Sequence, residues 1–169
     1  PAQSFFIVFR KSTPLTTQVA VGNFPVLRPR VELSGPWEVT FDAKWGGPAT
    51  PVTFPQLEDW TRRPEPGIRY YSGTAVYRTT FDEPTVGAQV TTLTQIDLGT
   101  VQHLARARLN GRDLGVIWTA PWRAALPRGL LKAKGNRLEI EVVNVWANRL
   151  IGDEQEPPDC EWLPGHMGG

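Results

Sequence analysis

The clearest pattern in this chain is the alternation of apolar and polar residues. In residues 72–81 the odd-numbered positions from Ala75 to Phe81 fall on one side of an extended chain, and the even-numbered positions fall on the other. Residues 37–42 (WEVTFD) alternate in the same way, and so do residues 137–145. A period of two residues is typical of half-buried β-strands. The pattern therefore predicts three strands that each turn one face to a core.

Shorter apolar segments predict the remaining strands, at residues 5–9, 26–33, 95–98, 104–109, 112–118 and 121–126. Asn110-Gly111 stands between two of them and favours a two-residue hairpin turn. One helical turn is expected at Leu130-Leu131, and no run of 12 or more residues has helical period. Seven to nine short, evenly spaced strands predict an all-β fold, an antiparallel sandwich or barrel.

Composition narrows the function classes. The 169 residues suit one domain, and 16 glycines with 16 prolines fit a fold with many turns. The net charge of +1 lacks the basic surplus that nucleic-acid binding needs. The longest apolar run, Phe5–Phe9, is far shorter than the ~20 residues of a membrane span. A single cysteine, Cys160, excludes an internal disulfide, and no Cys/His cluster has zinc-site spacing.

Several short motifs carry a resemblance to known domains. The motifs GPW (35–37), FP (54–55), YRTTF (77–81), LNGRDLG (109–115) and GNRL (135–138), with Trp60, follow one another in the order seen in a galactose-binding-like jelly roll. Such jelly rolls occur in accessory regions of glycoside hydrolase family 2. A narrower set is similar to the C-terminal β-sandwich of family-106 glycoside hydrolases, the α-L-rhamnosidase type: LEDWT (57–61), YSGTAVY (71–77), WTAP (118–121) and WANRLIGDE (146–154). The last motif is the most specific, and the resemblance covers roughly residues 30–160.

The resemblance implies a domain organisation and a parent enzyme. Residues 26–160 are expected to form a jelly-roll β-sandwich of the galactose-binding-domain-like kind. Residues 1–25 are expected to be a strand remnant of a preceding domain plus a linker, and 161–169 a disordered or non-native tail. The family's closing strand has no counterpart after Cys160, so the chain is expected to be a fragment. The implied parent is a bacterial, secreted or periplasmic enzyme of polysaccharide degradation, and its catalytic carboxylates have no matching positions here.

Two segments have the composition of a carbohydrate site. Sugar rings stack on aromatic rings, and their hydroxyls bind planar polar groups. The candidate binding residues are Trp60, Arg62, Tyr70 and Tyr71 in one segment and Trp146, Asn148, Arg149, Asp153 and Glu154 in the other. Trp60 and Tyr70 are the preferred stacking groups. The alternative for each segment is structural, with Trp60 capping the sandwich edge and Arg149–Asp153 forming a buried ion pair that ties the last strand to a loop.

Other chemistry has less support in the sequence. Asp153 and Glu154 are adjacent, so on an extended chain they point to opposite sides and cannot face each other across a glycosidic bond. His103 has no triad partners at a suitable spacing. No cofactor is expected. Calcium can staple jelly-roll modules, but no Asp-rich calcium loop is present.

Three hypotheses for the function follow. The first is a non-catalytic carbohydrate-binding accessory module of a rhamnosidase-like enzyme, whose partners are a plant-type polysaccharide or oligosaccharide and the catalytic domain. The second is a structural domain that only supports a catalytic barrel. The third, an enzyme in its own right, lacks a plausible pair of catalytic carboxylates. The apolar segment Phe5–Phe9 is expected to pair with a sheet edge, in its own chain or in a strand-swapped homodimer.

Overall fold

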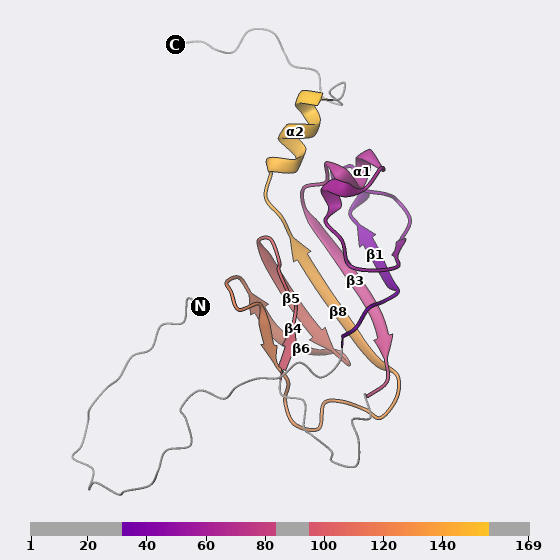
Figure 1. Ribbon diagram of the computed structural model, residues 1–169, viewed down its shortest axis with the longest axis vertical. Coiled ribbons are helices and arrows are strands. Elements are labelled where there is room, and N and C mark those ends of the chain that lie inside the picture. Colours follow the sequence, from indigo (N-terminus) through magenta and orange to yellow (C-terminus); the bar gives the residue numbers. More distant parts are fainter. Residues whose placement is uncertain (1–31, 84–94, 156–169) are drawn as a thin grey trace, which may run out of the picture.

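A computed structural model describes residues 32–83 and 95–155 of the chain (Figure 1). The expected strand at 5–9, the linker and the C-terminal tail lie outside these residues. The structure contains a six-stranded antiparallel sheet in the order β2-β1-β3-β8-β5-β6 and a two-stranded sheet of β4 and β7. The strands are β1 (Trp37–Phe41), β2 (Val52–Phe54), β3 (Thr74–Phe81), β4 (Gln95–Asp97), β5 (Leu104–Leu109), β6 (Arg112–Ile117), β7 (Arg123–Ala125) and β8 (Asn136–Val143).

The two strongest alternating segments form the centre of the large sheet. β3 pairs with β8 along all eight residues, from Thr74 opposite Val143 to Phe81 opposite Asn136. β5 pairs with the other edge of β8. Strict alternation fixes the register, because a shift by one residue would turn every apolar side chain to the opposite face. The expected all-β antiparallel fold is confirmed, and the arrangement is a sandwich.

The core lies on one face of the large sheet and has two halves. Over β1 and β3 it is aromatic, and six rings make edge-to-face or tilted contacts: Trp37, Phe41, Phe54, Trp60, Tyr71 and Tyr77. Over β5 and β6 it is aliphatic, with Ala107 and Ile117 packed against Ala124 of the β4–β7 sheet. Ile96 of β4 also packs against the larger cluster that contains the aromatic rings.

Short helical segments accompany the aromatic half. They are η1 (Ala43–Trp45), η2 (Trp60–Arg62) and α1 (Pro66–Arg69), and Trp60 and Ile68 from η2 and α1 are buried in the core. The longest helix, α2 (Ala147–Gln155), follows β8 and lies beyond the end of the sheet, at the same end as α1 (Figure 1). None of the helices in the described ranges is long and apolar enough to span a membrane.

The hairpin between β5 and β6 has the expected turn. Leu109 pairs with Arg112, and the two residues between them, Asn110 and Gly111, have φ values of 52° and 82°. Positive φ at both central residues defines a type I′ turn. The side chain of Asn110 also has a structural role, because it donates hydrogen bonds to the Leu130 carbonyl and to Asn136.

Some expected elements differ from the observed ones. The sequence pattern does not predict β2, because its three residues lie between Pro51 and Pro55 and are too few to establish an alternating pattern. The expected strand at 26–33 is not a strand at residues 32 and 33, and its remainder lies outside the described part of the chain. Leu130-Leu131 is not a helical turn; Leu130 instead closes a turn by donating its N–H to the Pro127 carbonyl.

Candidate functional site

Two of the candidate carbohydrate-binding side chains, Trp60 and Tyr71, lie in the core. Trp60 is 7% exposed and Tyr71 is 2% exposed, so neither ring can present a face to a sugar. The indole N–H of Trp60 donates to the Tyr77 hydroxyl at 2.5 Å, and the Tyr71 hydroxyl donates to the Thr74 carbonyl. The structure thus favours the structural alternative for Trp60 over the stacking role.

The charged residues around Trp60 bind one another over the aromatic core instead of forming an open binding loop. Arg63 pairs with Glu58 at 2.9 Å and with Glu65 at 2.6 Å. Its guanidinium lies 4.7 Å from the centre of the Phe54 ring. Arg62, the residue named by the sequence prediction, is exposed on η2. Sequence reasoning missed Arg63 because the two neighbouring arginines are indistinguishable without the geometry.

Burial of the Tyr77 hydroxyl makes the stability of the fold depend on pH in the alkaline range. Desolvation raises the pKa of its hydroxyl from 10.0 to about 12, against a smaller opposing effect of the hydrogen bond from Trp60. Because the phenol stays neutral longer in the folded state, its full contribution to stability is present below the unfolded-state pKa near 10. That contribution is lost as the pH rises from about 10 to 12. We expect the free energy of unfolding of the native chain to fall about 2–3 kcal/mol more between pH 9.5 and pH 12 than that of Tyr77→Phe. Urea titrations at several pH values measure this difference, and parallel curves for the two proteins would contradict it.

The second expected cluster lies on α2 and is divided between its two sides. Asn148, Arg149 and Asp153 are half-buried, and Gly152 is buried. Arg149 pairs with Asp153 one helical turn later at 2.9 Å. The ion pair of the structural alternative is present, but it is only partly buried and lies within the helix, so it does not tie the last strand to a loop. Glu154 is exposed.

Contacts with the loop before β3 fix α2 in place. The hydroxyl of Ser72 accepts a hydrogen bond from the Arg149 backbone N–H in the first turn of α2 and donates one to the Val145 carbonyl. A Cβ on Gly152 would lie 2.7 Å from the Tyr70 side chain, so the helix backbone lies directly against that residue. The Tyr70 hydroxyl donates to Gln155 at the helix end. The two expected clusters therefore meet, through Tyr70 and α2.

The other side of α2 carries large apolar side chains in contact with solvent. Trp146 is 78% exposed, Leu150 60%, Ile151 45% and the preceding Val145 49%. The sequence prediction named only Trp146 among them. We refer to Val145, Trp146, Leu150 and Ile151 as the α2 apolar face.

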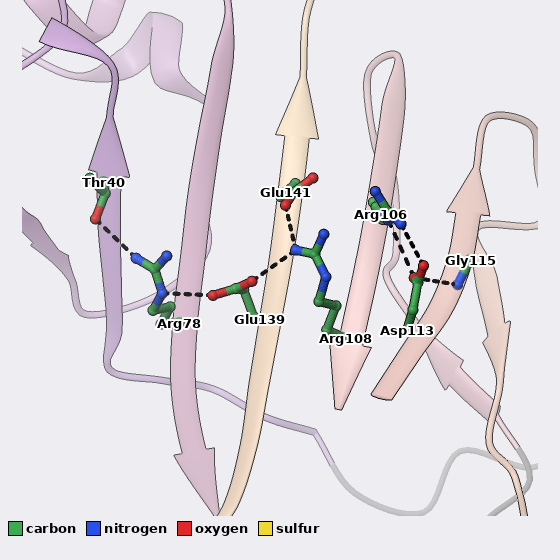
Figure 2. Close-up of polar contacts among 8 residues, drawn as sticks. All are labelled: Thr40, Arg78, Arg106, Arg108, Asp113, Gly115, Glu139 and Glu141. Carbon is green, nitrogen blue, oxygen red and sulfur yellow. Dashed lines mark hydrogen bonds and ion pairs between the residues drawn. The ribbon is translucent and has the colours of Figure 1, made fainter. Parts of the chain in front are cut away.

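The outer face of the large sheet carries a ladder of ion pairs (Figure 2). Glu139 on β8 accepts hydrogen bonds from Arg78 on β3 at 2.8 Å and from Arg108 on β5 at 2.9 Å. Arg108 also binds Glu141, and Arg78 donates to the Thr40 hydroxyl on β1. These side chains link four adjacent strands. The ladder residues occupy the polar positions of the alternating pattern, which are even-numbered in β1, β3 and β5 and odd-numbered in β8, although no motif marked them.

A polar cavity of about 800 Å³ borders this ladder. Its lining includes Arg78, Arg108, Lys132, Arg137, Glu38 and Glu139, together with Thr53, Thr79 and Thr80. Trp37 also lines it but is only 2% exposed. The cavity therefore offers charged and hydroxyl groups without an aromatic surface on which a sugar could stack.

Several carboxylates form ion pairs with arginine side chains, and these pairs lower their pKa values. A hydrogen bond from Arg106 lowers the pKa of Asp113 to about 2, and one from Arg123 lowers the pKa of Asp97. The Arg63 side chain likewise lowers the pKa of Glu65. A general acid in glycoside hydrolysis must keep its proton near neutral pH, which needs a raised pKa. These three carboxylates are thus unsuited to that role. Within the described ranges, no group of three or more His, Cys, Asp or Glu residues could hold a metal ion.

Comparison with known proteins places this geometry in context. No family model matches the chain. A protein of Formosa agariphila named "Putative beta-glucuronidase" is 37% identical over 131 residues, which make up 78% of this chain and 11% of that protein. The solved structure of a rhamnosidase from Novosphingobium sp. PP1Y matches at 36% identity with a TM-score of 0.65, over 79% of this chain and 13% of that one. Both of these relatives of the chain are glycoside hydrolases.

The matches cover only a small part of each relative. This chain spans only 11% to 13% of the length of the two relatives, so it corresponds to a small β-sheet domain of much larger enzymes. A β-glucuronidase of Ruminococcus gnavus shares the fold at a TM-score of 0.54, with 17% identity over 72% of this chain and 22% of that one. At that identity the likeness is one of fold alone.

Proposed function

We propose that this chain is a non-catalytic accessory β-sandwich of a larger glycoside hydrolase, of the family-106 rhamnosidase type with a galactose-binding-like jelly roll. One observation carries the proposal: 79% of the chain matches a rhamnosidase at 36% identity, yet the match covers only 13% of that enzyme. The lowered pKa values of Asp97, Asp113 and Glu65 make these three groups unsuited to act as a general acid.

The geometry supports a structural role better than sugar binding. Trp60 and Tyr71 are core residues, and Arg149 and Asp153 bind each other on α2. A sugar site on α2 would have to combine Trp146 with Arg149 and Asp153, whose side chains already bind each other. The supporting role within an enzyme therefore takes precedence in the proposal.

Carbohydrate binding remains a second candidate because of Trp146. Its indole is 78% exposed, which is the condition for stacking on the apolar face of a sugar. Affinity electrophoresis in polysaccharide gels separates the two candidates, with Trp146→Ala compared against Trp118→Ala, another tryptophan with 71% exposure. Retention that only Trp146→Ala abolishes supports sugar binding, and absence of retention supports the structural role.

The non-catalytic proposal has its own test. The purified chain is incubated with nitrophenyl α-L-rhamnoside and nitrophenyl β-D-glucuronide, and the release of nitrophenol is measured. We expect no release above the buffer rate. Turnover that persists through repeated purification and scales with the amount of protein would overturn the proposal.

A further inference from the structure

The orientation of α2 is the reverse of that in an ordinary surface helix. Such a helix turns its apolar stripe to the core and its polar side chains to water. Here Asn148, Arg149 and Asp153 are half-buried on the side that contains the buried Gly152. Residues four apart share a helix face, so Leu150 and the exposed Glu154 lie together on the opposite side, with Ile151 beside them and Trp146 immediately before the helix. The large apolar side chains of this segment are thus exposed to solvent, with Glu154 among them.

The α2 apolar face is held in a fixed orientation. Gly152 packs on Tyr70, Ser72 binds the first turn of the helix, and Asn144 joins the end of β8 to the same loop by donating to the Tyr71 carbonyl and accepting from the Gly73 N–H. A helix attached at its first turn and along one side presents the opposite side without reorganisation. Such preorganisation lowers the entropic cost of an interface.

We propose that the α2 apolar face docks onto another domain of the same enzyme. This inference rests on the proposed function, and it names the surface through which the domain joins the rest of the enzyme. The relatives carry most of their length outside the matching region, so a neighbouring domain is available in them as the occupant. The chemistry expected of the partner is an apolar surface patch that accepts an indole and three aliphatic side chains.

Interface size distinguishes this occupant from a second copy of the chain. A nine-residue helix is only about 14 Å long, whereas a stable association of separate molecules buries about 800 Å² on each partner. Two domains of one polypeptide are held near each other by the chain itself, which raises their effective concentration to the millimolar range. A small apolar contact is then sufficient to keep them together.

The test compares one pair of substitutions in two settings. Trp146→Gln with Leu150→Gln is introduced into the isolated chain and into a hybrid in which this chain replaces the matching part of the Novosphingobium rhamnosidase. The matched control is Trp118→Gln with Val116→Gln, whose native side chains are 71% and 53% exposed and belong to β6 or the residue after it. We expect the α2 pair to leave the melting temperature of the isolated chain unchanged. In the hybrid it should shorten the half-life of rhamnosidase activity at elevated temperature about fivefold or more, while the control pair has no effect.

Each other outcome has a defined meaning. Equal half-lives for the α2 pair and the control pair in the hybrid overturn the docking inference and leave the proposed function intact. A lower melting temperature of the isolated chain also overturns the inference, because the chain's own residues would then cover the helix. A hybrid that is inactive even with native residues counts against the proposed function itself.

Discussion

Replacing Trp60 with alanine is expected to lower the free energy of unfolding by about 3–5 kcal/mol. The indole is 7% exposed and contacts the rings of Phe41 and Tyr71 at centroid distances of 5.4 and 5.8 Å. Its removal leaves a cavity that a sheet on one side and a short helical loop on the other cannot fill. It also deprives the buried Tyr77 hydroxyl of its hydrogen-bond donor.

Guanidinium denaturation followed by circular dichroism measures this loss. Trp146→Ala is the control, because that indole is 78% exposed and its removal should change stability by less than about 0.5 kcal/mol. If the two alanine variants were equally stable, Trp60 would not be a core residue and the aromatic half of the core would be wrongly placed.

Asn136→Ala is expected to destabilise the protein by about 2–4 kcal/mol, because it would leave several backbone and side-chain groups unpaired. Asn136 is fully buried at the start of β8. Its amide N–H donates to the Lys132 carbonyl, and its carbonyl oxygen accepts from the Lys132 backbone N–H and from the Asn110 side chain. This one side chain therefore ties the β5–β6 hairpin turn to the loop before β8.

The matched control for Asn136 is Lys132→Ala, which keeps the backbone groups of residue 132 and removes only an exposed side chain. Its effect should stay within about 0.5 kcal/mol. Urea denaturation of both variants measures the difference. A loss below about 1 kcal/mol for Asn136→Ala would mean that water replaces its hydrogen bonds and that the loop is not held by this residue.

The sheet was largely predictable because its signal is local. Strict alternation in β1, β3 and β8 and the Asn110-Gly111 turn each depend on neighbours in the sequence, and these elements formed close to the expected positions. β2 and α2 depend on distant partners. Val52–Phe54 is a strand only because it pairs with β1, and the first turn of α2 is bound by Ser72, more than 70 residues earlier.

The candidate site was predicted less well, for a reason visible around Trp60. Four charged residues between 58 and 63 predict a surface loop. Their side chains do lie at the surface, but the Trp60 indole between them is buried. The Arg63 guanidinium pairs with Glu58 and Glu65 above the Phe54 ring, so charge covers the aromatic core. Composition alone cannot separate an aromatic residue beneath such a cover from one that stands beside it in water.

The central claim is the proposal that this chain contains a non-catalytic domain of a larger glycoside hydrolase. The most direct measurement is the sequence of the reading frame that contains the codons for Pro1 to Gly169. The account predicts that the frame continues without a stop into a region several times longer that encodes a catalytic domain, as the 11% and 13% coverage of the two relatives implies. A frame that begins and ends with these residues, and encodes nothing more, would contradict it.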